Sequence, residues 1–215
     1  MALELYFHPL SSFCQKVLIA LYENDTPFQP HIVDLSNEAS AAPLRRLWPI
    51  GKFPVLRDGA TNRTVPESSL IIEYLDRQYP GRTQFLPTEP DFAHEARTLD
   101  RFFDLYVNER VGKIVTDRQR PAPKRDAYGV ELAKAQLQIA LDMVDRDMAT
   151  KNWAMGATFG LADCAAAPAL FYADLVMPFG ATHKHAAAYL HRLLRRPSFA
   201  RAVQEAEPYR ALFPR

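Results

Sequence analysis

The spacing of hydrophobic and polar positions divides the chain into a mixed first part and a helical second part. Residues 3–7 predict a short strand, and the break over residues 8–12 precedes a helical pattern. Prolines at 27 and 30 bracket a predicted turn, after which residues 31–34 predict a second strand. Pro43-Leu44 is expected to open a short helix that stops before Trp48.

Residues 51–69 carry the densest set of turn and helix signals in the chain. Pro54 has no N–H, so a strand that starts there lies at a sheet edge or has its backbone turned outward. Asp58-Gly59 predicts a turn, Thr64-Val65 a return strand, and Glu67-Ser68 the acidic and hydroxyl residues that open a helix. The expected order over residues 1–80 is therefore β-α-β-α-β-β-α.

The second part is expected to be all helical. Residues 81–90 are polar and proline-rich and predict a linker, which leaves residues 91–215 as a separate domain. Its first helix is expected to be long and to end at Pro121, and further helices are predicted around residues 132–144, 160–172 and 196–199. The stripe that defines the long helix consists of Leu99, Phe102, Phe103, Tyr106, Val107, Val111 and Ile114.

Composition narrows the possible partners. The chain has 215 residues, 48% hydrophobic and 24% charged, and its net charge of +1 gives no reason to expect nucleic acid or a membrane surface as a partner. No stretch reaches the run of about 18 apolar residues that a membrane helix needs, and a cytoplasmic location is expected. Cys14 and Cys164 are far apart, without a CxxC or Cys/His cluster, so neither a disulfide framework nor a metal site is expected.

Two motifs in this order resemble the glutathione S-transferase family, of the cytosolic serine type. Lys52-Phe53-Pro54-Val55-Leu56 followed by Glu67-Ser68 is similar to the part of that fold that cradles glutathione. The resemblance implies a thioredoxin-like domain over residues 1–80, a cis Phe53–Pro54 bond, and an all-helical domain that contributes the electrophile site. Residues 159–163 resemble the family's capping box, but Gly160 stands at the hydroxyl position, so only the Asp163 half is expected to form.

The resemblance assigns glutathione, as co-substrate, to five residues. Ser68 at a helix start would bind the γ-glutamyl carboxylate with help from the helix dipole, and Glu67 would bind the ammonium group. Pro54 shapes the loop from which Val55 would pair with the cysteinyl backbone, as an added strand does. Lys52 would meet the glycine carboxylate, although a lysine in a loop is more often simply solvated.

The same resemblance places thiol activation at the first helix. Aligning Lys16-Val17 with the basic and apolar pair of serine-type members puts Ser11 at the activating position, with Ser12 as its rival. Lowering a thiol pKa by about two units needs about 2.7 kcal/mol, and a hydroxyl that donates to a charged sulfur supplies about 1.5–3 kcal/mol. Ser11 can instead be an ordinary N-cap. Cys14 is a small buried residue or, alternatively, the thiol of a mixed disulfide with glutathione.

The expected function is a glutathione transferase that detoxifies electrophiles by attack of the glutathione thiolate, without a metal. Phe13, Phe103, Tyr106 and Arg110 are candidates for the electrophile pocket, although an aromatic stripe is more often core. Glutathione-dependent isomerase, peroxidase or thiol reductase activity remains open, as does a non-catalytic interaction module of the same fold. The resemblance further implies a twofold homodimer that pairs the N-terminal domain of one subunit with the helical domain of the other.

Overall fold

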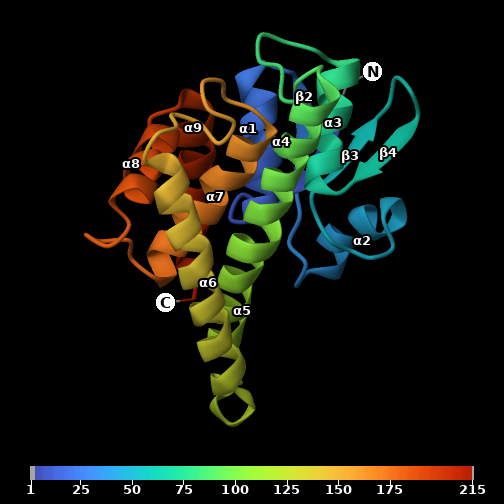
Figure 1. The fold of residues 1–215 in the computed structure, drawn as a ribbon. Helices are drawn as coiled ribbons and strands as arrows, with labels where there is room; N and C mark the ends of the chain where they lie inside the picture. Colours follow the sequence, from blue (N-terminus) through green and yellow to red (C-terminus); the bar gives the residue numbers. More distant parts are fainter. Residues whose placement is uncertain (1–2, 215) are drawn as a thin grey trace. The chain divides into compact units, whose positions relative to one another are not determined.

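The computed structural model describes residues 3–214, which form two units (Figure 1). The first unit runs to Leu86 and includes Pro197–Pro208, and the second runs from Pro87 to Arg196 and resumes at Tyr209. Each unit is thus built from two separate stretches of sequence. Within residues 3–214, no helix combines the length and the apolar composition needed to cross a membrane.

The first unit contains a four-stranded sheet in the order β2-β1-β3-β4. The strands are β1 (Leu3–Phe7), β2 (Phe28–Ile32), β3 (Val55–Asp58) and β4 (Arg63–Pro66). β1 runs parallel to β2 and antiparallel to β3, and β3 runs antiparallel to β4. The predicted order of strands and helices is confirmed, but β2 starts at Phe28 rather than residue 31. The prediction was wrong there because Pro30 is tolerated in β2, which is an edge strand.

Helices cover both faces of this sheet. Leu5 and Leu56 lie opposite each other in register and are fully buried. They share their face with Asp58, which accepts hydrogen bonds from Tyr74 of α3 (Ser68–Gln78) and from Tyr79, the C-cap of that helix. Helix α1 (Ser12–Glu23) packs against α3. On the other face, Val55 packs with Leu44 of α2 (Glu38–Leu47). The sheet therefore has a three-layer environment, with its central strands shielded from water.

Helix α2 begins earlier than the sequence predicts. It starts at Glu38, with Asn37 as the N-cap, whose side chain accepts a hydrogen bond from Ser40 N–H at 3.2 Å. Pro43 consequently lies inside the helix instead of opening it. The expectation was wrong because it treated Pro43 as the start signal and overlooked the asparagine cap. The predicted end, before Trp48, is confirmed.

The second unit is all helical among the described residues. The predicted long helix is present as α4 (Pro90–Phe102), a π-helical turn (Phe103–Asn108) and α5 (Glu109–Arg118). The wider turn changes which positions face inward, so Phe103 is buried while Tyr106 is 56% exposed. The helices that follow are α6 (Ala127–Met148), α7 (Leu161–Val176) and α8 (Lys184–Leu194), and α9 (Pro197–Ala206) belongs to the first unit.

Helix α6 buries a different face from the one that the sequence indicates. Three of the residues that marked it, Leu132, Ile139 and Met143, are exposed. The buried face instead uses small as well as large residues, namely Ala133, Leu137, Ala140, Leu141, Val144 and Met148. Helix α6 therefore carries apolar residues on two faces, and only one of these faces is covered by other residues between 3 and 214.

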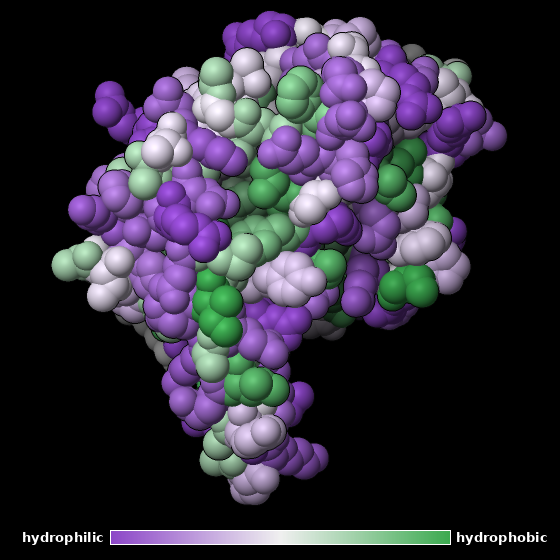
Figure 2. Space-filling model, viewed as in Figure 1, coloured by the Kyte–Doolittle hydropathy of each residue, from purple (hydrophilic) through white to green (hydrophobic). Residues whose placement is uncertain are grey.

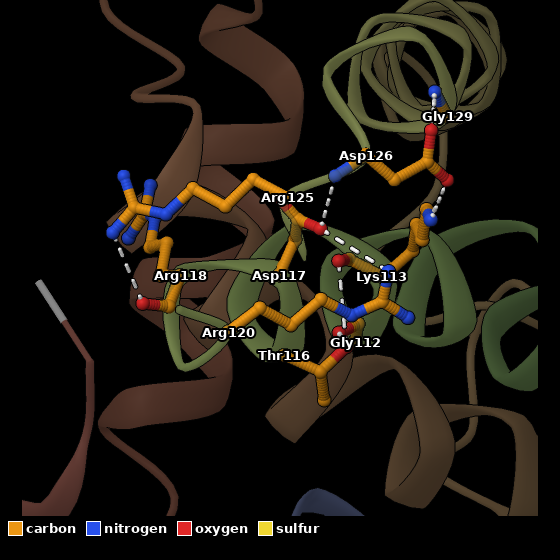
Figure 3. Close-up of polar contacts among 9 residues, drawn as sticks. All are labelled: Gly112, Lys113, Thr116, Asp117, Arg118, Arg120, Arg125, Asp126 and Gly129. Atoms are coloured by element: carbon orange, nitrogen blue, oxygen red, sulfur yellow. Dashed lines mark hydrogen bonds and ion pairs between the residues drawn. The ribbon is translucent and has the colours of Figure 1, made fainter. Parts of the chain in front are cut away.

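The hairpin between α5 and α6 is fixed by a polar cluster (Figure 3). Asp126 caps α6 by accepting a hydrogen bond from Gly129 N–H at 2.9 Å, and it also pairs with Lys113 of α5. Asp117 of α5 accepts a hydrogen bond from the backbone N–H of Asp126 at 2.9 Å. One aspartate thus connects the start of α6 to the preceding helix, and its pKa is lowered by these partners.

The start of α7 confirms the expected half of a capping box. Asp163 accepts a hydrogen bond from Gly160 N–H at 2.9 Å, and Gly160 offers no side chain in return. The same carboxylate accepts hydrogen bonds from Ala154 N–H at 2.8 Å and from Tyr189 O–H at 2.5 Å. Burial raises the pKa of Asp163 to about 6, although these donors act in the opposite direction.

Candidate functional site

The sheet register brings three loops to one edge of the first unit. Tyr6 pairs with Val55, and Val55 pairs with Pro66. The end of β1, the start of β3 and the end of β4 therefore lie side by side. The loop before α1, the loop before β3 and the link from β4 to α3 leave this edge together, and two helix N-termini begin next to it. Such N-termini favour negatively charged groups.

The first of these loops is anchored by its own polar groups. The backbone C=O of His8 accepts a hydrogen bond from Ser11 N–H at 3.0 Å. Gln15, buried in α1, donates from Nε2 to the C=O of Pro9 at 2.9 Å. The His8 ring stacks on Phe53 of the second loop, with 6.1 Å between ring centroids. Sequence reasoning missed His8 and Gln15, whose signal was only their place beside the strand-to-helix break.

Ser11 lies at the N-cap of α1. Its Oγ accepts a hydrogen bond from Cys14 N–H at 3.4 Å, which is long for an N-cap bond. Ser12 is the first residue of the helix, and both serines are half-buried. Cys14 is fully buried, and burial raises the pKa of its thiol to about 12. The geometry therefore leaves two partly accessible hydroxyls and an inaccessible thiol at the helix start.

The second loop contains the cis Phe53–Pro54 bond that the resemblance implied. Pro54 is buried and lies directly before β3, which is an internal strand rather than an edge strand. Of the two possibilities raised for Pro54, the edge position is therefore wrong. Val55 lies between its register partners on β1 and β4, and Lys52 is exposed at the start of the loop.

The third segment carries the acidic and hydroxyl residues. Glu67 has a φ of +70°, a conformation that is uncommon for a residue with a side chain, and it is exposed. Ser68 follows as the first residue of α3 and is 5% exposed. Residues held in such conformations cluster at ligand-binding sites, where the surrounding structure maintains them. The structure brings Ser11, Val55 and Ser68 to the same end of the sheet, where β1 and β4 end and β3 begins.

A buried lysine beneath this edge was not expected from the sequence. Lys16 is 1% exposed, and its Nζ donates to Ser69 Oγ at 2.9 Å. Lys16 had served only to align the first helix with the family, and Ser69 had no assigned role. The available signal was a lone basic residue inside the apolar pattern of α1.

The candidate electrophile residues fall in both units. Phe13 is half-buried in α1 of the first unit. In the second unit, Phe103 is 3% exposed and contacts Phe102 edge-on at 5.4 Å between centroids, so it is part of the core. Tyr106 is exposed, and Arg110 donates from Nε to the C=O of Leu105 at 3.3 Å. A shared pocket of these side chains stays a prediction.

Among residues 3–214, no group of three or more His, Cys, Asp or Glu side chains is arranged to hold a metal ion. The groups that the candidate site offers are serine hydroxyls, backbone groups and two helix N-termini. These groups suit an anionic peptide-like ligand.

Comparison with known proteins identifies the family of the chain. Residues 5–83 match the glutathione S-transferase N-terminal domain, and residues 125–196 match the glutathione S-transferase C-terminal domain. The chain belongs to the glutathione S-transferase family. The two matches together span most of its length, and the first includes all three loops at the candidate site. The family that was expected from residues 52–68 is confirmed.

Individual relatives of this family member differ in name. A glutathione S-transferase-like protein, LUC7, from a Fusarium species is 30% identical over 148 residues, or 69% of this chain and 64% of that protein. The matched region thus spans less than two thirds of that relative. A stringent starvation protein A homolog from Haemophilus influenzae is 28% identical over 198 residues, or 91% of this chain and 87% of that protein.

A crystal structure supports the fold assignment. The glutathione S-transferase from Methylobacterium radiotolerans, solved in complex with glutathione sulfonate, has a TM-score of 0.82 and 29% sequence identity. The comparison covers 94% of this chain and 95% of the other. The thioredoxin-like sheet with helices, followed by an all-helical unit, is therefore the family fold, as expected.

Proposed function

We propose that this family member is a glutathione transferase, in which the thiolate of glutathione attacks an electrophilic substrate. The observation that carries the proposal is the convergence of two helix N-termini and the cis-proline loop at one sheet edge. Glutathione has two carboxylates and a thiol, and each needs a partner that favours negative charge. The Methylobacterium radiotolerans neighbour, crystallised with glutathione sulfonate, supports glutathione as co-substrate.

Glutathione is proposed to bind along the edge formed by β3 and α3. Ser68 offers its hydroxyl and backbone N–H at the first turn of α3 to the γ-glutamyl carboxylate. The exposed Glu67 takes the ammonium group, and the backbone of Val55, which follows Pro54, pairs with the cysteinyl unit. Lys52, exposed in the loop, takes the glycine carboxylate.

Ser11 is proposed to stabilise the thiolate. It lies at the N-terminus of α1, where the helix dipole adds up to about 1 kcal/mol for an anion. The hydroxyl adds about 1.5–3 kcal/mol when it donates to a charged sulfur. Ser12 is the rival for this role. Cys14 is disfavoured as the reactive group because its thiol is buried and has a raised pKa.

The helical unit is proposed to contribute the electrophile site. Tyr106 supports this best because its ring is exposed, and Arg110 is partly accessible. Phe13 of the first unit, also partly accessible, is a separate candidate contact. Phe103 is buried, so it would not contact the electrophile directly but would support the pocket through its packing in the core. The role is detoxification of an electrophile. Isomerisation, peroxide reduction or thiol reduction can use the same thiolate.

A second candidate function is a non-catalytic interaction module. The alternative is kept because one relative that matches over most of both chains, the stringent starvation protein A homolog, is not named as a transferase. The two functions differ at the thiol, because a module needs no ionised glutathione. Accessible hydroxyls at the start of α1 support the enzyme.

The chain is proposed to act as a cytoplasmic homodimer that pairs the N-terminal domain of one subunit with the helical domain of the other. Exposed apolar residues on α6, including Leu132, Ile139 and Met143, support coverage by a second copy, and Figure 2 shows hydrophobic residues gathered over α6. Both cysteines are free thiols, as is usual in a reducing compartment. Light scattering should give twice the chain mass of 24.4 kDa, and the single-chain mass would contradict the dimer.

The binding site is tested on immobilised glutathione. A Glu67→Ala, Ser68→Ala double variant should be retained much more weakly, since each hydrogen bond to a charged group contributes about 1.5–3 kcal/mol. The matched control is Ser36→Ala, Glu38→Ala, which removes an exposed serine and glutamate elsewhere in the same unit. Wild-type retention of the Glu67 and Ser68 variant would contradict the proposed site.

The enzyme and the module are separated by the pKa of bound glutathione. Ser11→Ala should raise this pKa by about one to two units, measured from thiolate absorbance during a pH titration. Glutathione affinity should stay within a few fold. Ser12→Ala is the matched control, and a shift seen only with that variant would assign the role to Ser12. A wild-type protein that leaves the bound thiol at its solution pKa would favour the module.

A further inference from the structure

Lys16 is a buried cation beneath the candidate site. It lies in α1 and is 1% exposed, although lysine is among the residues least often buried. Its Nζ donates to Ser69 Oγ of α3 at 2.9 Å. Transfer of an ammonium group out of water is unfavourable, and well-placed partners must offset the cost. A leucine or methionine of similar length would fill the same space without that cost.

Lys16 contacts the helix turn that is proposed to bind the γ-glutamyl carboxylate. Ser69 directly follows Ser68, so both belong to the first turn of α3. The hydrogen bond from Lys16 to Ser69 therefore restrains the first turn of α3. Ser68, in the same turn, is proposed to bind the γ-glutamyl carboxylate. Lys16 is not an exposed contact for a ligand, because its side chain is 1% exposed and its Nζ donates to Ser69 of α3.

We propose that Lys16 is a positioning residue for the carboxylate-binding first turn of α3. Its ammonium group holds Ser69 in place, and its positive charge, shielded from water, favours an anion at the adjacent residue. This inference rests on the proposed function, because it assumes that Ser68 binds the γ-glutamyl carboxylate. It adds α1 to the elements that determine glutathione affinity.

A role confined to packing predicts a different result. If Lys16 only fills the core, its replacement lowers stability and changes the affinity for every ligand of the folded protein to the same extent. If Lys16 acts on the carboxylate site, the loss depends on whether the ligand carries that carboxylate. A cycle that combines a protein change with a ligand change isolates this dependence.

The test compares glutathione with 4-aminobutyryl-cysteinylglycine, which lacks only the α-carboxylate of the γ-glutamyl unit. By isothermal titration calorimetry, Lys16→Met should weaken glutathione binding about tenfold and the analogue less than about twofold. Lys16→Arg, which keeps the charge, should recover most of the affinity. Leu18→Met is the packing control on the same helix, since Leu18 is also fully buried.

The outcomes separate this inference from the proposed function. Suppose that the wild type binds glutathione, and that Lys16→Met lowers the affinity for both ligands equally or does not lower it at all. That result would overturn the positioning role alone. A wild-type protein that binds neither ligand would overturn the proposed function and the inference with it. If Lys16→Met does not fold, Ser69→Ala keeps the lysine and removes the hydroxyl to which its Nζ donates. That variant should weaken glutathione binding more than analogue binding, and an equal effect would contradict the role.

Discussion

At the start of α1, a single hydroxyl can serve two neighbours. A serine hydroxyl has one donor hydrogen and two acceptor lone pairs. Ser11 Oγ uses an acceptor position for Cys14 N–H, and that bond does not use the hydroxyl hydrogen. The N-cap role and the proposed catalytic role are therefore compatible. Ser11→Ala should cost about 1 kcal/mol of stability as well as raise the pKa of the bound thiol.

A second residue-scale prediction concerns Asp58, which is fully buried. Burial acts to raise its pKa, but hydrogen bonds from Tyr74 at 2.6 Å, Tyr79 at 2.7 Å and Ala60 at 2.8 Å hold the pKa below its usual value. Because the folded-state pKa is depressed, this contribution is present above about pH 4 and is lost as the pH falls further. Asp58→Asn should cost about 1.5–3 kcal/mol or more at pH 7.

Urea unfolding at several pH values measures this effect. The difference in unfolding free energy between wild type and Asp58→Asn should shrink as the pH falls below about 4, since asparagine does not titrate. Asp76→Asn is the matched control for Asp58→Asn. It makes the same substitution at another aspartate of the first unit, one that accepts hydrogen bonds from backbone N–H groups. A difference for Asp58→Asn that is independent of pH would contradict the assignment.

The third prediction is that Cys14 is chemically inert in the folded protein. The thiol is fully buried, and its pKa of about 12 leaves very little thiolate near neutral pH. In a Cys164→Ala variant, reaction with Ellman's reagent should be slow in buffer and complete in denaturant. Rapid reaction of the folded variant, or a mixed disulfide with glutathione, would indicate a thiol-disulfide catalyst.

At the scale of elements, the sequence predicts best where backbone chemistry is local. Pro54, the Asp58-Gly59 turn and Glu67-Ser68 each restrict their own neighbourhood, so the strands and helix around them were predicted correctly. The buried face of α6 depends on which partner helix covers it, and its small residues Ala133 and Ala140 gave no signal. The role of Lys16 likewise depends on Ser69, far away in sequence, and no local pattern indicates that contact.

The two glycines in the α5–α6 hairpin should respond to alanine in opposite directions (Figure 3). A Cβ on Gly112 would meet nothing within 4 Å, so Gly112→Ala should stabilise the chain by about 0.5–1 kcal/mol through helix propensity. A Cβ on Gly129 would clash with Asp126 Oδ2. Asp126 is held by its cap bond and by Lys113, so Gly129→Ala should be destabilising.

Thermal unfolding of the two variants provides the measurement. Because both substitutions are glycine to alanine in neighbouring helices, each is the control for the other. Adding Asp126→Ala to Gly129→Ala removes the clash and the cap together, so the two costs should not add. Equal stabilisation by both single substitutions would show that the Asp126 side chain moves aside without loss.

At the scale of the whole molecule, the first unit depends on the end of the chain. Helix α9 packs on α1, with Phe199 1% exposed. Two polar contacts reinforce the packing: Ser198 donates to Glu23, and Tyr22 O–H donates to Glu205 at 2.5 Å. Residues around Leu21 and Tyr22, which the sequence assigned to the first domain alone, are thus covered by residues 197–208.

The prediction at this scale is that α9 contributes strongly to the stability of the first unit. Phe199→Ala should cost about 3–5 kcal/mol, the usual range for a buried phenylalanine. Gln204→Ala, on the exposed side of the same helix, should stay within about 0.5 kcal/mol of wild type. Chemical unfolding checks both values, and a small effect of Phe199→Ala would mean that α9 is only loosely attached.

The divided first unit also constrains how the protein can fold while it is being synthesised. Leu86 and Pro197, which belong to the same unit, are separated by the second unit in the chain. At typical translation speeds of about 5–20 residues per second, the ribosome needs on the order of 10 s to make the intervening segment. During this interval the emerged sheet lacks α9, and the apolar surface of α1 that Phe199 later covers is open to chaperones or to wrong partners.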